Sequence, residues 1–432
     1  HTANKKKLSE AKPNTAHYGT IADENETPID DVVVTLFIAP HSFTGEDTVE
    51  ISCHGSIYIQ QQIISLLLRA GCRLAQPGEF TRRAFTNGKL DLSQAEAVAD
   101  LIASTSAASH RLAMQQMRGG FSRELILLRE KLLTFASLVE LELDFSEEEV
   151  EFADREKLTD LASEIERVIK RLSDSFTLGN AIKNGVPTAI IGETNAGKST
   201  LLNRLVKEDK AIVSDIHGTT RDVIEDTVVL QGITFRFIDT AGIRETHDAI
   251  ENMGIERTFQ KLDQAHIVIW LIDATGSTQD IEKIAGRVLP HCTDKRLIVA
   301  FNKVDKIESA TQQQLTDLYK RLTREKPNTS FIFLSASHDQ NIDILEKQLT
   351  DTVQSTQTGE NDIIVTNARH YEALLNAHDA ILRTLNGLQS GLSGDFLAQD
   401  IRECMHYLGE ITGQISTDEI LGTIFSKFCI GK

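Results

Sequence analysis

Four short polar motifs lie in the middle of this 432-residue chain, at 192–199 (GETNAGKS), 218–222 (GTTRD), 239–242 (DTAG) and 302–305 (NKVD). All but the second directly follow an apolar run. An apolar run that ends in a polar loop is typical of a buried strand in an open α/β sheet, whose ligands lie at the carboxyl ends of the strands. The motifs therefore predict a doubly wound sheet with a polar site along one edge.

The first motif has the spacing G-x-x-x-x-G-K-[ST]. It lies between the apolar run 189–191 and the helix-compatible segment 200–205. A strand, a glycine loop and a helix start are the context that this phosphate-binding pattern requires. Backbone N–H groups of such a loop point at phosphates, and Lys198 would reach the β- and γ-phosphates. Ser199 would then ligate Mg²⁺.

Two aspartates divide the rest of the site. Asp239 ends the strand pattern 234–238, so we expect it to hold Mg²⁺ through water, with the Gly242 amide at the γ-phosphate. Asp305 can accept from both N–H donors on the edge of guanine, whereas adenine offers no such pair. By itself NKVD also fits a polar turn after a buried strand. Its place after the other motifs, with SAS at 335–337 beyond it, favours guanine.

Composition is that of an ordinary globular protein, with 41% hydrophobic and 25% charged residues, and the length suggests two to four domains. The formal charge of -18 argues against a protein that coats nucleic acid, so a nucleic-acid partner would require a local basic patch or a basic helper protein. Because the chain lacks a long apolar run, we expect a cytoplasmic enzyme without a membrane span. It starts without Met or an apolar signal core, which suggests that a segment is missing before His1.

Cysteine usage predicts neither disulfides nor zinc, because the five cysteines are scattered and form no C-x-x-C pair. They are Cys53, Cys72, Cys292, Cys404 and Cys429.

Proline placement divides the chain, because none of the seven prolines lies between Pro77 and Pro187 or after Pro327. Apolar spacing within these two stretches predicts helices at 95–101, 125–143, 158–172, 371–388 and 396–408. Strands are predicted between them at 186–191, 227–230, 234–238, 267–272, 297–301 and 331–334. Ahead of the helices, strands at 31–38 and 48–53 and a helix at 57–70 predict a small α+β domain.

The predicted fold is therefore multidomain. A small α+β N-terminal domain spans 1–88, an all-α helical domain spans 89–181 and 356–432, and a Ras-like α/β P-loop GTPase domain spans 182–355. Helices on both flanks suggest one discontinuous helical domain, since the termini of a domain often lie close together. Two separate helical domains are the alternative.

Segments outside the nucleotide motifs carry a more specific resemblance. In the first half they are 42–47 (SFTGED), 54–55 (HG), 77–80 (PGEF), 84–85 (AF), 89–92 (KLDL) and 94–97 (QAEA). The chain ends with 424–425 (IF) and 428–432 (FCIGK). With these segments the whole chain resembles the MnmE (TrmE) family of tRNA-modifying GTPases. The family's opening strand and a glycine-rich stretch with a folate-contacting arginine are absent here.

This resemblance implies a folate-binding and dimerising first domain, a homodimer, and a flavoprotein partner of the MnmG (GidA) type in a heterotetramer. Together the partners would modify the 5-position of the wobble uridine (U34) in certain tRNAs, using 5-formyl-tetrahydrofolate or a related folate. Glu50, Lys89 and Lys432 match the family's folate contacts. Cys429 matches a cysteine that matters for modification, although a buried packing cysteine is an equal alternative. A prenylation box is rejected because Gly431 is not aliphatic.

The motifs and the resemblance together give a set of expected GTP contacts. They are Asn195, Ala196, Gly197, Lys198, Ser199, Thr200, Ser214, Asp215, Ile216, His217, Gly218, Thr219, Thr220, Asp239, Thr240, Ala241, Gly242, Asn302, Lys303, Asp305, Ser335, Ala336 and Ser337. The Mg²⁺ ligands expected among them are Ser199 and Thr220.

Hydrolysis requires a cation and a positioned water. After DTAG many small GTPases place a glutamine, but this chain has Ile243, which cannot orient water. The family's K⁺ site is matched by Asn195, Ser214, Ile216 and Thr219, where K⁺ would take the place of an arginine finger when two GTPase domains pair.

Glu251 matches the family's catalytic glutamate and would act through water. Its charged rivals nearby are Arg244, Glu245, Glu256 and Arg257. The acidic run at 147–151 is read as a solvated helix end rather than a metal site.

Two other functions are alternatives. A ribosome-assembly or regulatory GTPase of the same potassium-dependent class would carry an RNA-binding module and lack the KLDL and CIGK segments. A scaffold with a dead nucleotide site conflicts with the intact Lys198, Ser199, Asp239 and Asp305.

Overall fold

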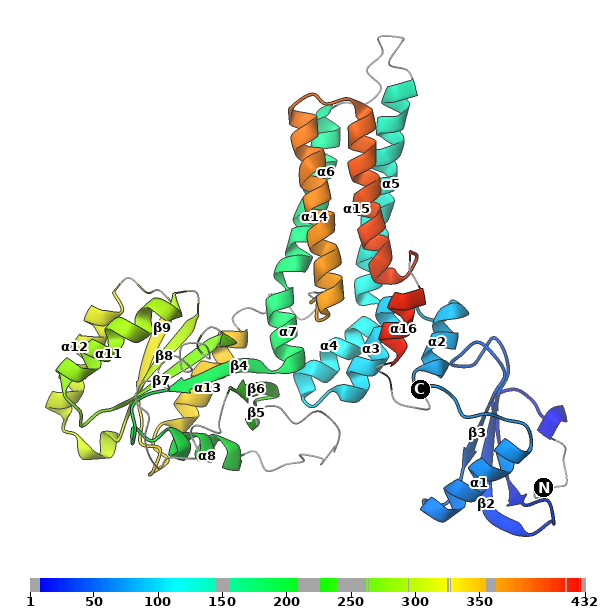
Figure 1. The fold of residues 1–432 in the computed structure, drawn as a ribbon, viewed down its shortest axis with the longest axis horizontal. Coiled ribbons are helices and arrows are strands. Elements are labelled where there is room, and N and C mark those ends of the chain that lie inside the picture. Colours follow the sequence, from blue (N-terminus) through cyan, green and yellow to red (C-terminus); the bar gives the residue numbers. More distant parts are fainter. Residues whose placement is uncertain are drawn as a thin grey trace. The chain divides into compact units, whose positions relative to one another are not determined.

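The computed structural model describes residues 8–144, 155–208, 226–238, 262, 264–293, 295–324, 326, 328–354, 363–415, 418–426 and 428. The chain forms two compact units (Figure 1). The first contains His1–Ala103, Ala113–Lys170 and Glu372–Lys432, and the second contains Ser104–Leu112 and Arg171–Tyr371. No described helix is long and apolar enough to cross a membrane.

The first unit opens with the short 3-10 helix η1 (Leu8–Glu10) and a three-stranded antiparallel sheet. Its strands, in spatial order, are β1 (Thr15–Ala22), β2 (Pro28–Phe37) and β3 (Thr48–Ser52), followed along the chain by α1 (Ile57–Arg69) and α2 (Glu79–Thr86). Val32 and Leu36 are buried on one face of β2, and Ile63 of α1 is also buried. The sequence predicted β2, β3 and α1 but missed β1.

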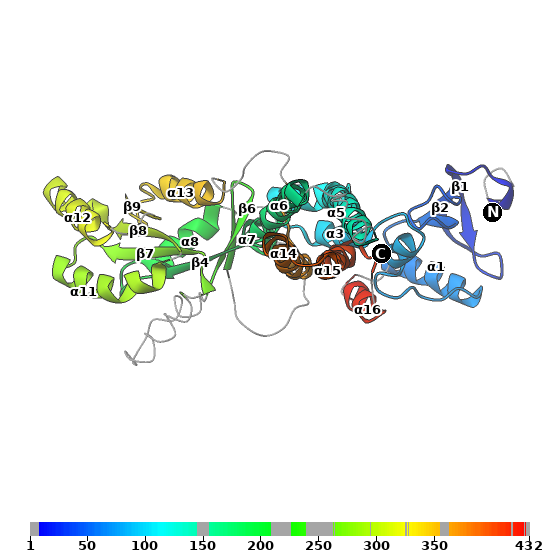
Figure 2. The same cartoon turned by 90° about the horizontal axis from the view of Figure 1, so that it is seen from above.

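Long helices form the rest of the first unit, with parts of α4, α6 and α14 assigned to the second. The helices are α3 (Leu92–Ala103), α4 (Ala107–Met117), α5 (Gly120–Asp144), α6 (Arg155–Asp174), α14 (Ala368–Gln389), α15 (Gly394–Thr412) and α16 (Asp418–Ser426). Helices α5 and α15 pack along each other, and both figures show them side by side (Figures 1 and 2). Helical stretches from both ends of the chain therefore share one bundle, which confirms the discontinuous helical domain.

The second unit is built on a six-stranded sheet with the order β5-β6-β4-β7-β8-β9. The strands are β4 (Val186–Ile191), β5 (Asp226–Leu230), β6 (Ile233–Phe237), β7 (Ile267–Asp273), β8 (Arg296–Asn302) and β9 (Thr329–Phe333). All pairings are parallel except β5 with β6. This is the doubly wound sheet that the motifs predicted.

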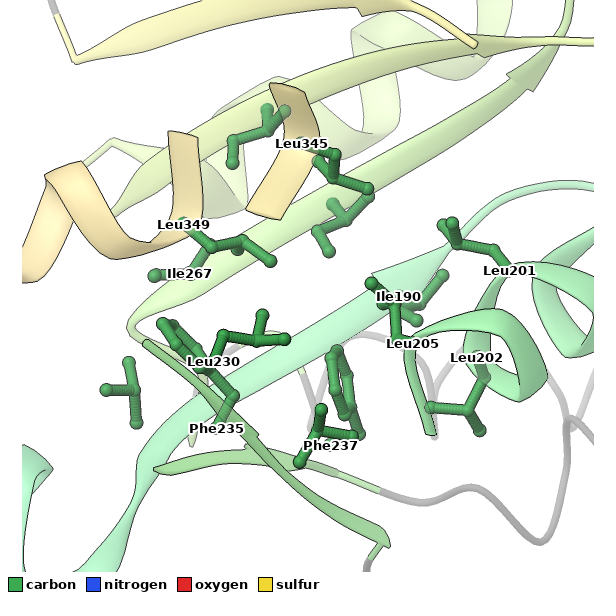
Figure 3. Packing of buried hydrophobic residues seen from close by; sticks show 14 of the residues in the cluster. Ile190, Leu201, Leu202, Leu205, Leu230, Phe235, Phe237, Ile267, Leu345 and Leu349 are labelled. Atoms are coloured by element: carbon green, nitrogen blue, oxygen red, sulfur yellow. The ribbon is translucent and has the colours of Figure 1, made fainter. Parts of the chain in front are cut away.

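Both faces of this sheet are covered by helices. They are α7 (Phe176–Asn184), α8 (Lys198–Glu208), α11 (Thr278–Val288), α12 (Ser309–Leu322) and α13 (Ile342–Gln354), with the 3-10 helices η3 (Leu289–Cys292) and η4 (Val304–Lys306). Strand β7 explains the two layers, because Ile269 and Leu271 join one apolar cluster and Val268 and Trp270 join the other. Alternation along a strand sends successive side chains to opposite faces. Helices α8 and α13 cover the first cluster (Figure 3).

A two-residue turn joins β5 to β6, with Gln231 at φ 49° and Gly232 at φ 80°. The carbonyl of Gly232 accepts a hydrogen bond from the N–H of Ala108, at 3.3 Å. Ala108 lies in the first turn of α4 and joins the apolar cluster of the sheet. The start of α4 is therefore part of the α/β unit.

Two chain segments of the second unit, α7 and the residues around Val365, pack closely against each other. Gly179 in α7 approaches the carbonyl of Val365 so closely that an added Cβ would lie 2.0 Å from that oxygen. The Val365 N–H donates to the hydroxyl of Ser175 at 3.0 Å, and the rings of Phe176 and Tyr371 stack with centroids 4.3 Å apart. The segments that enter and leave the inserted domain are thus fastened to each other.

Substituting Gly179 by alanine tests this close packing. Alanine favours a helix, but the added methyl must displace backbone at Val365, so we expect a loss of about 1–3 kcal/mol in unfolding free energy. The matched control is Gly286→Ala in α11, where nothing lies within 4 Å of an added Cβ. That variant should gain about 0.5–1 kcal/mol, and urea unfolding of both variants measures the difference. Equal stability changes would contradict the close packing.

Candidate functional site

The loop between β4 and α8 takes backbone conformations with positive φ that favour glycine and asparagine. Gly192 has φ 153°, and an added Cβ would lie 2.2 Å from the carbonyl oxygen of Leu271. Gly197 has φ 99°, and an added Cβ would lie 2.3 Å from the side-chain nitrogen of Asn302. Asn195 between them takes the left-handed conformation at φ 67°, with its side chain exposed. The two motif glycines are therefore required by close approach to neighbouring strands.

Lys198 begins α8 and folds back over this loop. Its Nζ donates to the carbonyls of Gly192 and Glu193, at 2.6 and 2.8 Å. Burial lowers the pKa of Lys198, because loss of water penalises the charged ammonium, while the nearby Glu193 opposes the shift. An anion inside the loop would compensate this desolvation. Ser199 and Thr200 follow in the first turn of the helix, at the end that favours negative charge.

Asn302 of the NKVD motif joins the glycine loop to the SAS segment. Its side-chain nitrogen donates to the carbonyl of Ala196 in the glycine loop, at 2.7 Å. Its side-chain oxygen accepts from the N–H of Ala336 in the SAS segment, at 3.0 Å. The residue is only 3% exposed, and both hydrogen-bonding groups of its amide are used. The base end and the phosphate end of the expected site are thus held in one arrangement.

The two charged residues of the NKVD motif, Lys303 and Asp305, have different environments. Lys303 takes the left-handed conformation at φ 66°, and its Nζ contacts the Asp273 carboxylate at 2.5 Å. The carboxylate of Asp305 stays partly exposed, beside Ser335. A hydrogen bond from the Ser335 hydroxyl is the main reason that the pKa of Asp305 lies below its usual value. Asp305 therefore presents an ionised acceptor at the edge of the site.

Sequence reasoning missed Asp273, which ends β7 as Asp239 ends its own strand pattern. Burial raises the pKa of Asp273, but hydrogen bonds from Lys303 and Thr275 outweigh this effect and leave the pKa lowered. Asp273 therefore stays ionised and fixes Lys303 at the rim of the site. Its position at the carboxyl end of an apolar run was the signal that could have identified it.

Several predicted site residues lie outside the described residues. They are Ser214, Asp215, Ile216, His217, Gly218, Thr219, Thr220, Asp239, Thr240, Ala241, Gly242, Glu251, Cys429 and Lys432. The roles expected of them stay predictions. Among the described residues no group of three His, Cys, Asp or Glu side chains could hold a metal ion. The Mg²⁺ and K⁺ sites stay predictions, because most of their expected ligands lie outside the described residues.

The two described folate candidates lie in the first unit. Glu50 is exposed on β3 and pairs in register with Thr35. The Nζ of Lys89 donates to the carbonyl of Pro40 at 2.9 Å, and nearby the side chain of Asn87 donates to the carbonyl of Thr44 at the same distance. Lys89 is thus held beside the SFTGED segment at 42–47.

Asn302→Ala tests the bridge between the motifs. The buried carbonyl of Ala196 and N–H of Ala336 would lose their partner, so we expect a loss of about 1–3 kcal/mol in unfolding free energy. Nucleotide affinity should fall as well. Thermal unfolding and titration with a fluorescent guanine nucleotide measure the two effects. Asn328→Ala, at an exposed position in the same unit, should change neither, and equal effects of both substitutions would disprove the bridge.

Comparison with known proteins covers almost the whole chain. Residues 92–429 match the family description "MnmE helical domain", and residues 1–89 match "GTP-binding protein TrmE N-terminus". Proteins named "tRNA modification GTPase MnmE" from Bacteroides thetaiotaomicron and Bacteroides fragilis are 62% and 60% identical over 427 residues, covering 99% of this chain and 91% of each relative. The protein of that name from Flavobacterium johnsoniae is 54% identical over 434 residues, with the same coverage.

A solved GTP-binding protein from Sulfolobus solfataricus in complex with GDP aligns with 53% of this chain and 68% of its own. Its identity is 19% and its TM-score 0.31. The family matches extend from residue 1 to residue 429, and the relatives are more than half identical along nine-tenths of their length. The chain belongs to the MnmE (TrmE) family.

Proposed function

We propose that this protein is a GTP hydrolase that takes part in tRNA modification. The observation that carries the proposal is the bridge made by Asn302, which holds the phosphate loop and the SAS segment in one arrangement. Relatives up to 62% identical bear the name "tRNA modification GTPase MnmE". The geometry of the loop and the NKVD and SAS segments supports binding of a guanine nucleotide. The names of the relatives support a role in tRNA modification.

The reaction transfers the γ-phosphoryl group of GTP to water. Lys198 begins a helix and lies inside a glycine loop, so its ammonium can neutralise charge on the β- and γ-phosphates. The carboxylate of Asp305 would accept hydrogen bonds from the two N–H groups on the edge of guanine. Hydroxyl oxygens of Ser199 and Thr220 suit Mg²⁺, which would neutralise phosphate charge when bound. Asp239 would support that ion through water.

Hydrolysis in this proposal depends on K⁺ and on Glu251. Ile243 stands where a water-orienting glutamine is common, so another group must position the water. The exposed Asn195 amide can supply an oxygen to K⁺ at the mouth of the loop. Ser214, Ile216 and Thr219 would complete the site on pairing of two GTPase domains, and Glu251 would act on the water through a second water.

Turnover should therefore depend on the monovalent cation. We expect GTP hydrolysis at least about tenfold faster in KCl than in NaCl at equal ionic strength, because K⁺ replaces the charge of an arginine finger. Glu251→Ala should lower turnover and leave GTP affinity unchanged. Steady-state phosphate release and nucleotide titration measure these quantities. Equal rates in both salts would exclude the K⁺ proposal, and lost affinity in the variant would assign Glu251 a structural role.

A homodimer through the first unit is part of the proposal. Tyr18 and Val33 are opposite each other in the register of β1 and β2, and their exposed fractions are 60% and 39%. Strand alternation places them on the sheet face opposite the buried Val32 and Leu36. Exposed apolar residues on a sheet face are typical of protein interfaces. A second copy of the chain would cover this face.

The remaining parts of the proposal follow from the resemblance. A flavoprotein of the MnmG type, a one-carbon folate held by Glu50, Lys89 and Lys432, and Cys429 would act with the GTPase on the wobble uridine of tRNA in the cytoplasm. Lys89 is held beside the SFTGED segment, which supports a role for that region. Calorimetry with 5-formyl-tetrahydrofolate tests the site, and an unchanged isotherm for Glu50→Ala would contradict it.

The decisive experiment measures wobble uridine. Mass spectrometry of tRNA from a deletion strain should show loss of the 5-carboxymethylaminomethyl group, and the intact gene should restore it. A gene carrying Lys198→Ala should not restore it, because the variant cannot neutralise the phosphates. Gly286→Ala is the control and should restore it fully. Normal modification in the deletion strain would refute the proposal and favour the ribosome-assembly alternative.

A further inference from the structure

The loop from β9 to α13 holds a histidine at the rim of the proposed guanine site. Ser335 and Gln340 exchange two backbone hydrogen bonds of 3.1 Å, and the N–H of His338 donates to the carbonyl of Ser335 at 3.2 Å. Asp339 and Asn341 both take the left-handed conformation, at φ 60° and 61°. Backbone hydrogen bonds therefore fix the position from which the His338 side chain extends.

The imidazole of His338 lies against the residues that would bind guanine. Its Nδ1 is 3.0 Å from the hydroxyl of Ser337, 3.1 Å from that of Ser335 and 3.6 Å from Oδ2 of Asp305. The last distance is that of an ion pair rather than a hydrogen bond. The His338 side chain is 65% exposed and that of Asp305 20% exposed. The ring can therefore move away while the carboxylate stays in place.

Charged residues lie on the segments next to this ring, and Asp305 is the one with a contact to it. Asp305 and Lys306 follow β8, Asp339 is the next residue in the loop, and Arg204 of α8 donates to the carbonyl of Ser337 at 3.3 Å. The Ser335 hydroxyl, followed by smaller contributions from His338 and Lys306, keeps the pKa of Asp305 below its usual value. Asp305 stays ionised near neutral pH, so among these groups the histidine is the one whose type changes charge between about pH 5 and 8.

Guanine needs both lone-pair edges of the Asp305 carboxylate, one for each of its two N–H donors. A positively charged imidazole attracts the same carboxylate and must release it before the base can enter. We propose that His338 competes with guanine for Asp305, so that protonation of its ring weakens guanine-nucleotide binding. The inference rests on the proposed GTP site and adds a residue that sets affinity within it.

The sign of the effect follows from linkage. Guanine and a protonated ring would compete for the same carboxylate, so nucleotide binding and ring protonation oppose each other. Binding therefore expels a proton, and affinity falls as pH decreases. Exposed ion pairs are weak, so the effect is modest, about two- to fivefold.

The experiment compares the GDP affinity of the whole protein and its His338→Ala and His338→Gln variants, using a fluorescent GDP at about pH 6 and about pH 8. The phosphates of GDP also titrate in this range, and this contribution is common to all three proteins. The ratio of affinities between variant and wild type removes it. We expect both variants to bind about two- to fivefold more tightly than wild type at the lower pH, and within about twofold at the higher pH. His110→Ala, at an exposed position in the same unit, should match wild type at both.

Asp305→Asn supplies a second background in which the carboxylate is gone. Its amide can donate to the extra oxygen of xanthine, so this variant should bind a fluorescent xanthosine diphosphate. There, His338→Ala should no longer change the pH dependence. A constant ratio at both pH values, or an unchanged His338 effect in the Asp305→Asn background, would overturn this inference while leaving the GTP site intact. Failure of wild type to bind GDP at either pH would instead refute the proposed function, and this inference with it.

Discussion

The amide of Asn302 is the interaction on which the nucleotide site depends. It uses its donor on the carbonyl of Ala196 and its acceptor on the N–H of Ala336, and water cannot replace these bonds because the residue is almost fully buried. The phosphate loop and the SAS segment are separated by more than a hundred residues, and this side chain links them directly. A residue with a Cβ at position 197 would clash with the same amide, so this position requires glycine.

The sheet converts that local arrangement into a rigid support. Alternating residues of β7 fill two apolar clusters, so helices are held on both faces and the strand ends stay in register. At one sheet edge the β5-β6 hairpin contacts the first turn of α4 through Gly232 and Ala108. The hairpin starts shortly after the GTTRD motif and ends just before DTAG. The α4 contact therefore ties a helix to the segment between two nucleotide motifs.

Charged residues also position the acceptor for the guanine base. Asp273 fixes Lys303, and Ser335 keeps Asp305 ionised, so the acceptor for guanine is ready before the nucleotide arrives. The imidazole of His338 lies 3.6 Å from Asp305 at this rim.

The sequence by itself determined the sheet of the α/β unit and the long helices of the bundle. Strand alternation, helical spacing and the glycine loop are local patterns, and local patterns are readable because side-chain periodicity follows from backbone geometry. It missed β1 and Asp273, and it gave no bounds for helices α2, α4, α7, α11, α12, α13 and α16. Only the tertiary structure decided that Asn302 joins two motifs, that Gly179 passes against Val365 and that His338 faces Asp305. These contacts join residues far apart in the chain, and their partners depend on how the elements pack rather than on any spacing within the sequence.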